Sequence, residues 1–317
     1  MICGALRHDY ICIMNKRLRI VFMGTPDFAL PTLQILLSQG YDIPVVITAP
    51  DKAAGRGLKK RQSTIKLFAL SEKIDVWQPI NLKDESFQSE LKLLNADLFI
   101  VVAFRILPDS VLDIPKLGSI NLHASLLPQY RGAAPINWAI INGEKESGVT
   151  TFFIKAKVDT GDILMQKKIP IHSDDDSELL HDKLMLLGAE TMLETVKLIE
   201  SGHYKPIPQQ SGKELKPAPK IYRELGELKA SMSAQQAYNL IRGLSPHPAC
   251  FFNYEGKQIK IYKTNTPENK LFGDRFFQKH GGKIYLHFFD ASLEITSLQQ
   301  QGKKRMSADD FIKGFRF

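Results

Sequence analysis

The first two hundred residues alternate between short apolar runs and segments in which apolar residues recur with helical spacing. The first run, Leu18 to Met23, is followed by a turn at Gly24 and then by a helical pattern over residues 28–38. A strand, a tight turn and a helix in this order open a doubly wound sheet. The later strand-like segments are residues 43–49, 75–77, 97–103, 119–123, 149–154 and 163–171, and the helical ones are 64–73, 84–94, 133–141 and a long segment reaching about residue 200. We therefore predict an α/β domain with a doubly wound, mostly parallel, Rossmann-like sheet.

The pattern changes after Gly202. Prolines at positions 206, 208, 217 and 219 stiffen a segment of little apolar content, which we interpret as a linker over residues 203–220. A helix over 233–244 and short strands over 249–254, 258–262, 283–289 and 293–298 then predict a small β-barrel domain over residues 221–317. The first domain covers residues 18–202. Residues 1–17 are expected to be a disordered extension, in which residues 1–13 precede a more natural start at Met14.

Composition is that of a soluble globular protein, with 44% apolar and 24% charged residues. No uninterrupted apolar run approaches eighteen residues, so we expect no membrane span. Cys3, Cys12 and Cys250 are odd in number and lack Cys-x-x-Cys spacing, which predicts a reducing, cytoplasmic location and no structural metal. Gly24 stands alone without the rest of a Gly-x-Gly-x-x-Gly pattern, which disfavours a dinucleotide cofactor.

The net charge of +8 is located almost wholly in the last third of the chain. Residues 204–317 contain 19 Lys and Arg against 10 Asp and Glu, whereas the preceding residues contain 23 against 24. A basic appendage on a near-neutral domain suggests a polyanionic partner such as nucleic acid. A solvated, solubilising surface accounts for the same charge equally well.

The strand-like segment over 119–123 carries the main candidate chemistry. Alternation places Asn121 and His123 on one face, and a turn-rich run follows directly. Asp159 lies on a second Gly-containing turn after another apolar run. An amide donor for an oxyanion, an imidazole for proton transfer and a carboxylate to orient it suit the attack of an amine on a carbonyl. On spacing alone, a polar strand end satisfied by its neighbours is the competing interpretation.

The residues around this site resemble the 10-formyltetrahydrofolate-dependent formyltransferases. The resemblance rests on Asn121-x-His123, on Ser125-Leu126-Leu127-Pro128, on the run Tyr-Arg-Gly-Ala-Ala-Pro over 130–135, and on Asp-Thr-Gly-Asp over 159–162. It covers the chain from about Arg19 to Phe315. It implies that 10-formyltetrahydrofolate is the co-substrate, bound along Ser125, Leu126, Leu127 and Pro128 and near Leu107. It also implies catalytic roles for Asn121, His123 and Asp159 without a metal.

A basic segment over residues 51–61 bears on which molecule accepts the formyl group. It contains two glycines and no acidic residue after Asp51, which predicts a mobile loop that cannot bury an apolar face. It is either a solvent-exposed loop or a lid that becomes ordered when it binds a phosphate backbone. The resemblance favours the lid, because family members that act on initiator methionyl-tRNA carry such an insertion and their OB-like C-terminal domain binds tRNA. The residues predicted to bind tRNA are Lys52, Arg56, Lys59, Lys60, Arg61 and Arg242.

Two segments depart from the family pattern. Residues 104–108 are one residue shorter than usual and lack a glycine, and Lys155 and Lys157 stand where the family has Asp and Gly. Three alternatives remain open: a formyltransferase acting on an amino-sugar nucleotide, a folate hydrolase that passes the formyl group to water, and a non-catalytic RNA-binding protein on this scaffold. We expect a monomer with no membrane partner.

Overall fold

The computed structural model describes residues 17–54, 59–210, 212, 214–269 and 275–315. The predicted extension therefore lies, except for its last residue, outside the described part, and so does Arg56. The chain forms two compact units. The first contains the residues up to His123, Val149–Gln166 and Met185–Gln210, and the second contains Ala124–Gly148, Lys167–Leu184 and Ser211–Phe317.

The main sheet is mostly parallel, as predicted. Among the described residues it has the order β5-β2-β1-β6-β7-β8-β9. Pairing is parallel from β5 through β7, whereas β8 runs antiparallel to β7. Every residue of β6 is buried, which accounts for its unbroken apolar sequence. The strands are β1 (Arg19–Gly24), β2 (Asp42–Ile47), β5 (Asp75–Trp77), β6 (Leu98–Val102), β7 (Ser119–His123), β8 (Glu146–Phe153) and β9 (Ile163–Pro170).

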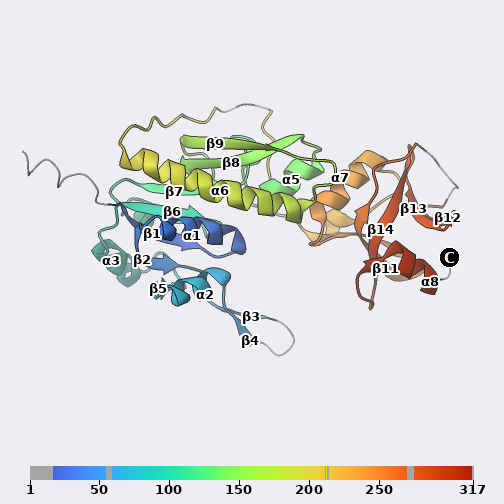
Figure 1. Ribbon diagram of the computed structural model, residues 1–317, viewed down its shortest axis with the longest axis horizontal. Helices are drawn as coiled ribbons and strands as arrows, with labels where there is room; N and C mark the ends of the chain where they lie inside the picture. The colour runs from blue at the N-terminus through green and yellow to red at the C-terminus, as the bar shows by residue number, and fades with distance from the viewer. Residues whose placement is uncertain (1–16, 55–58, 211, 213, 270–274, 316–317) are drawn as a thin grey trace, which may run out of the picture. The chain divides into compact units, whose positions relative to one another are not determined.

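Helices connect and cover these strands (Figure 1). Two of them begin at side-chain caps, where Ser63 accepts from the backbone N–H of Lys66 and Asp84 accepts from that of Phe87. The long helix α6 (Ser177–Glu200) packs on the sheet, since the hydroxyls of Thr151 on β8 and Thr195 lie 2.7 Å apart. The others are η1 (Asp27–Ala29), α1 (Leu30–Ser38), α2 (Thr64–Ser71), α3 (Glu85–Leu93), α4 (Asp109–Leu112) and α5 (Pro135–Ile141).

The basic segment differs from the loop that we expected. Its two arms, β3 (Lys52–Ala54) and β4 (Lys59–Arg61), pair as antiparallel strands, with Lys52 opposite Arg61 and Ala54 opposite Lys59. Figure 1 shows this ribbon projecting away from the main sheet. Backbone pairing alone can hold such a ribbon, so the charged composition that argued against a buried face does not exclude strands.

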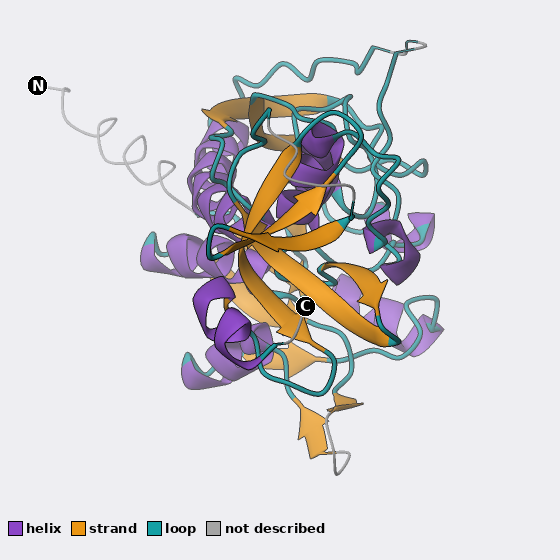
Figure 2. Ribbon diagram, turned by 90° about the vertical axis from the view of Figure 1, so that its right-hand side faces the viewer, coloured by secondary structure: helices purple, strands orange, loops and turns teal. Residues whose placement is uncertain are grey.

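The C-terminal part is a helix followed by a curled antiparallel sheet, as predicted. Helix α7 (Ala234–Leu244) begins at a capping box formed by Ser233 and Gln236. Figure 2 shows the strongly twisted strands of the sheet in orange. Within the described residues its order is β10-β11-β14-β13-β12, with β15 beside β14. The elements are η2 (Arg223–Gly226), β10 (Cys250–Tyr254), β11 (Lys257–Thr264), β12 (Phe277–His280), β13 (Lys283–His287), β14 (Ser292–Gln300), β15 (Met306–Ser307) and α8 (Ala308–Gly314).

The predicted linker pairs with both units. Ile207 and Ile163 at the start of β9 exchange two backbone hydrogen bonds of 2.8 and 2.9 Å. Within the second unit, Ala218 forms a parallel bridge with Gly132, and its carbonyl lies so close that a Cβ on Gly132 would stand 2.5 Å from the oxygen. The proline-containing segment is therefore paired with neighbouring backbone at Ile207 and at Ala218.

Candidate active site

The last residues of β7 carry two of the predicted catalytic side chains. Asn121 lies opposite Phe152 of β8 and His123 lies opposite Thr150. His123 is buried, with 7% of its surface exposed, whereas Asn121 is partly exposed and lines a cavity. Strand alternation thus places the amide and the imidazole on one side of β7, as the sequence pattern predicts.

Asp159 reaches the same place from the loop after β8. Its carboxylate Oδ2 lies 3.8 Å from Nδ1 of His123, and the two side chains are only 13% and 8% exposed. This separation is longer than a hydrogen bond but within the range of an ion pair when the imidazole is protonated. The structure therefore brings Asn121, His123 and Asp159 together in the first unit.

The loop that carries Asp159 is tightly fixed. Asp159 has a positive φ of 53°, a conformation that few non-glycine residues adopt. The loop is closed by a backbone hydrogen bond of 3.0 Å from Phe153 N to Asp162 O. Lys155, one of the departures from the family pattern, donates to both carboxylate oxygens of Asp162 at 2.9 Å. Its positive charge thus has a local ion-pair partner.

A cavity of about 110 Å³ lies beside these residues. Asn121, Asp159 and the predicted folate contact Leu107 all line it. The shortened segment before Leu107 is anchored by Arg105, which donates to the carbonyls of Pro79 at 2.7 Å and Ile80 at 3.0 Å. Burial lowers the pKa of the Arg105 guanidinium.

The other predicted folate residues follow His123 directly in the chain and belong to the second unit. Ser125 and Leu127 are buried, and the Ser125 hydroxyl donates to the carbonyl of Gln129 at 2.7 Å. Leu126 and Pro128 are partly exposed. Further along, Tyr130 N donates to Lys216 O at 2.7 Å. The turn over residues 125–130 is therefore held by the Ser125 hydroxyl and by the linker backbone at Lys216.

Tyr130 also lies at the centre of a polar cluster in the second unit. Its hydroxyl donates to Glu144 at 2.5 Å, and Lys216 Nζ lies 2.6 Å from the same carboxylate oxygen. Burial, followed by the hydrogen bond to Glu144, raises the pKa of Tyr130. Sequence patterns did not single out Lys216 or Glu144, because their partners are distant in the chain.

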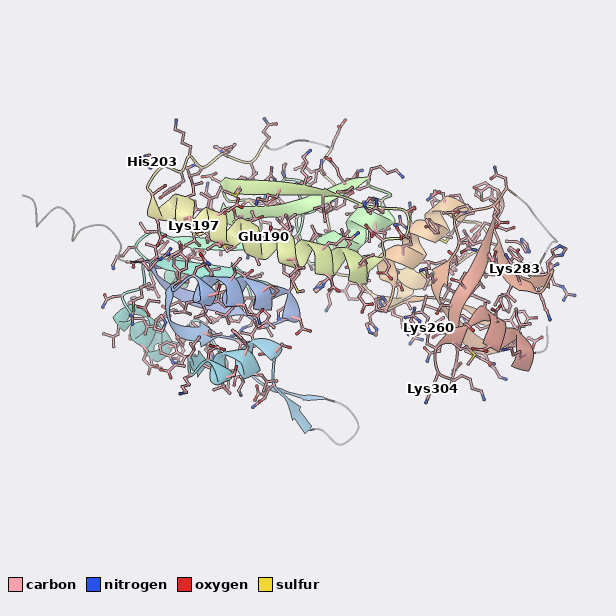
Figure 3. The ribbon with its side chains drawn as sticks, in the orientation of Figure 1. Glu190, Lys197, His203, Lys260, Lys283 and Lys304 are labelled. Atoms are coloured by element: carbon pink, nitrogen blue, oxygen red, sulfur yellow. The ribbon has the colours of Figure 1, made fainter. Side chains whose placement is uncertain are left out.

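The residues predicted to bind tRNA are only partly described. Lys52, Lys59, Lys60 and Arg61 lie on the β3–β4 ribbon, whose backbone alone is described. Basic side chains of the C-terminal part include Lys260, Lys283 and Lys304, labelled in Figure 3. Lys260 donates to Pro248 O at 3.1 Å and Lys283 pairs with Glu294 at 2.8 Å.

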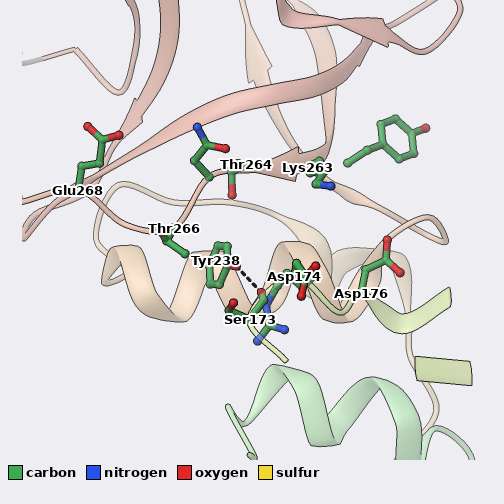
Figure 4. Close-up of a pocket in the computed structure, with 11 residues that line it drawn as sticks. Ser173, Asp174, Asp176, Tyr238, Lys263, Thr264, Thr266 and Glu268 are labelled. Atoms are coloured by element: carbon green, nitrogen blue, oxygen red, sulfur yellow. Dashed lines mark hydrogen bonds between the residues drawn. The ribbon is translucent and has the colours of Figure 1, made fainter. Parts of the chain in front are cut away.

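Arg242 is held within the protein. It donates to the carbonyl of Asp175 at 2.7 Å and to the side-chain oxygen of Asn239 at 3.0 Å. Burial lowers the pKa of its guanidinium. Its neighbour Tyr238 donates to the carbonyl of Ser173, the hydrogen bond that Figure 4 marks with a dashed line beside a cavity of about 370 Å³. Arg242 and Tyr238 thus tie the loop before α6 to helix α7.

Two further observations concern the described residues alone. None of their helices combines the length and the apolar character needed to cross a membrane. No group of three or more His, Cys, Asp or Glu side chains in this part of the chain is arranged to hold a metal ion.

Comparison with known proteins identifies the class. Residues 18–196 match the family described as Formyl transferase, and residues 220–316 match Formyl transferase, C-terminal domain. The chain belongs to this family of formyl-transferring enzymes. It is 47% identical to the methionyl-tRNA formyltransferase of Bacteroides fragilis over 95% of this chain and 96% of that protein. It is 46% identical to the methionyl-tRNA formyltransferase of Flavobacterium johnsoniae over 95% and 98% of the two chains.

Solved structures share the fold at lower identity. The sugar 3N-formyltransferase WlaRD, solved with dTDP and 5-N-formyl-THF, has a TM-score of 0.67 and 22% identity over 92% of this chain and all of that one. HypX from Aquifex aeolicus in complex with tetrahydrofolic acid has a TM-score of 0.65 and 18% identity. This chain covers 47% of HypX, about half its length.

Proposed function

We propose that this enzyme transfers the formyl group of 10-formyltetrahydrofolate to the amino group of initiator methionyl-tRNA, for bacterial-type translation initiation. The observation that carries the proposal is the 46–47% identity to methionyl-tRNA formyltransferases along 95% of the chain. That length includes both the β3–β4 ribbon and the C-terminal domain. A cytoplasmic, monomeric enzyme suits this role.

The geometry of the three polar residues supports the chemistry. The methionyl ammonium must lose a proton before its nitrogen attacks the formyl carbon. A new C–N bond then forms, the bond from the formyl carbon to folate N10 breaks, and N10 takes up a proton. We assign Asn121 to donate to the developing oxyanion. We assign His123 to proton transfer and Asp159 to orienting its imidazole at 3.8 Å.

Part of the co-substrate is proposed to occupy the cavity lined by Leu107, Asn121 and Asp159. Ser125, Leu126, Leu127 and Pro128 are also proposed to bind it, as the family resemblance implies. No metal is required, because the reaction needs only proton transfer and stabilisation of one oxyanion. The tRNA is proposed to contact Arg56 and the lysines and arginine of the ribbon, together with basic residues of the C-terminal domain.

An amino-sugar nucleotide is the alternative acceptor. Sugar formyltransferases are among the structural neighbours, but at 22% identity they support only the shared fold. The much higher identity to enzymes named for methionyl-tRNA favours the tRNA. An RNA-binding protein without catalysis would have no need for the pair formed by the buried His123 and the partly exposed Asp159.

The test is a transfer assay with 10-formyltetrahydrofolate labelled in the formyl group. Initiator methionyl-tRNA and a dTDP-amino sugar are offered separately and in competition. We expect label on methionyl-tRNA, lost in Asn121→Ala and retained in Asn81→Ala, a control at an exposed turn. Label on the sugar would reassign the acceptor, release of labelled formate would indicate a hydrolase, and tRNA binding without transfer would indicate a non-catalytic protein.

A further inference from the structure

Gln209 contacts the catalytic loop from the linker. Its side-chain amide Nε2 donates to two backbone carbonyls, that of Asp159 at 3.0 Å and that of Gly161 at 2.8 Å. All three residues belong to the first unit. One amide group therefore holds the backbone on both sides of Thr160.

Backbone pairing places Gln209 at this position. Ile207, two residues earlier, exchanges hydrogen bonds of 2.8 and 2.9 Å with Ile163. Side chains alternate along an extended segment, so residues 207 and 209 point the same way. The pairing at Ile163 thus aligns the linker with the loop that ends at Asp162, and Gln209 faces that loop.

The loop is supported on its other side by β8. Phe153 N donates to Asp162 O at 3.0 Å, and an added Cβ at Gly161 would stand 1.5 Å from Phe153 O. Asp159 itself has a φ of 53°. Sparsely populated conformations of this kind persist only where the surroundings fix them. The β8 strand fixes the end of the loop, and Gln209 fixes the residue that carries the carboxylate.

We propose that Gln209 is a positioning residue that sets the Asp159 carboxylate relative to His123. It touches neither reacting atom and acts through the backbone of Asp159. A displacement of about 1 Å in a catalytic group can cost about a hundredfold in rate. The expected fall in kcat rests on the proposed function, whereas the expected change in the surroundings of the His123 imidazole does not.

The first test observes His123 directly. The imidazole NMR signals of the protein are recorded for the wild type, Gln209→Ala and Gln209→Glu, and the His123 signal is assigned with His123→Asn. Gln209→Glu keeps the size of the side chain but loses both N–H donors. We expect the His123 signals to shift in both Gln209 variants and to stay unchanged in Gln210→Ala, whose side chain is exposed. Unchanged His123 signals in both folded Gln209 variants would overturn the proposal.

The second test measures formyl transfer. We expect kcat to fall about ten- to a hundredfold in Gln209→Ala and Gln209→Glu. KM for both substrates should stay within about twofold, since the amide donates to the loop backbone at Asp159 and Gly161, and Gln210→Ala should match the wild type. An active wild type with normal kcat in both Gln209 variants would refute the positioning role. A wild type that formylates no methionyl-tRNA would refute the proposed function and leave the NMR test standing.

Discussion

Gly161 lies against the backbone of Phe153 so closely that a Cβ at this position would stand 1.5 Å from the Phe153 carbonyl oxygen. The obstacle is backbone, which cannot rotate away as a side chain would. We predict that Gly161→Ala forces the loop off β8 and lowers the free energy of unfolding by about 1–3 kcal/mol or more. Formyl transfer should fall with it, because Asp159 is two residues away.

The matched control is Gly212→Ala, where nothing lies within 4 Å of an added Cβ. Denaturant unfolding and transfer rates of the two variants separate a local clash from a general effect of adding a methyl group. Equal stability of the two variants would contradict the close packing of Gly161 on β8.

Removing either member of the His123–Asp159 pair should slow catalysis. We predict losses of about 10²–10⁴-fold in kcat for His123→Asn. In the double variant with Asp159→Asn the loss should be much less than the product of the single losses, because Asp159 acts through His123. Single-turnover transfer rates measure both effects. Multiplicative losses would show that Asp159 has a role independent of the imidazole.

Tyr41 should make the free energy of unfolding fall more steeply as the pH rises in the alkaline range. Its hydroxyl donates to Glu200 at 2.9 Å, and burial, followed by that hydrogen bond, raises its pKa from 10.0 to about 12. The folded state thus favours the protonated phenol, and this contribution is complete below pH 10 and lost as the pH rises through 12. We predict that Tyr41→Phe is less stable by about 1 kcal/mol near neutral pH.

Between pH 10 and 12, Tyr41→Phe should lose stability less steeply than the wild type. Denaturant unfolding at a series of pH values measures both quantities. Parallel pH profiles for the two proteins would show that the phenol is not coupled to folding.

Arg242 is predicted to stabilise the fold. Its guanidinium donates to Asp175 O at 2.7 Å, and its removal leaves that carbonyl without this donor. We predict that Arg242→Met lowers the free energy of unfolding by about 1.5–3 kcal/mol, whereas the exposed Lys263→Ala changes it by less than about 0.5 kcal/mol. Arg242 is also a proposed tRNA contact, so Arg242→Met should reduce the slope of log K against log salt by about 1. An unchanged slope would show that Arg242 acts on the fold alone.

The β3–β4 ribbon should contribute charge to tRNA binding. Replacing Lys59, Lys60 and Arg61 by Ala is predicted to weaken binding and to reduce the slope of log K against log salt by about 2–3. The transfer rate at saturating tRNA should change less than the affinity, since these residues lie outside the catalytic group.

The control for the ribbon replaces three exposed lysines elsewhere, namely Lys83, Lys92 and Lys197. It removes the same charge from the protein. Equal slopes in the two triple variants would show that only net charge matters and that the ribbon makes no specific contact.

Local signals allowed much of the fold to be predicted. The strand from Ser119 to His123 has the predicted bounds, because its alternation and the turn after it are contained in the segment itself. Helix α7 begins after Ser233 for the same reason, since a capping box lies within four residues. The short elements β12, β15 and α8 were not predicted.

Contacts between distant segments could not be predicted from the sequence. Nothing around Gln209 indicates that it bonds to Asp159, fifty residues away in the chain. The pairing of β3 with β4 was missed because charged residues do not show strand alternation. Chemistry and resemblance identified Asn121, His123 and Asp159. The structure adds the distance of 3.8 Å between His123 Nδ1 and Asp159 Oδ2. Their catalytic roles and the folate and tRNA contacts stay predictions.

The pairing of the linker also limits how the two halves of this protein can be exchanged. Residues 197–219 fall between the two family matches, yet Ile207 pairs with Ile163 and Ala218 pairs with Gly132. A chimera joined at residue 200 would therefore bring a foreign partner to the Asp159 loop. Functional hybrids with a relative should have their junction after Ala218, so that the connecting segment is inherited with the segments around Ile163 and Gly132 with which it pairs.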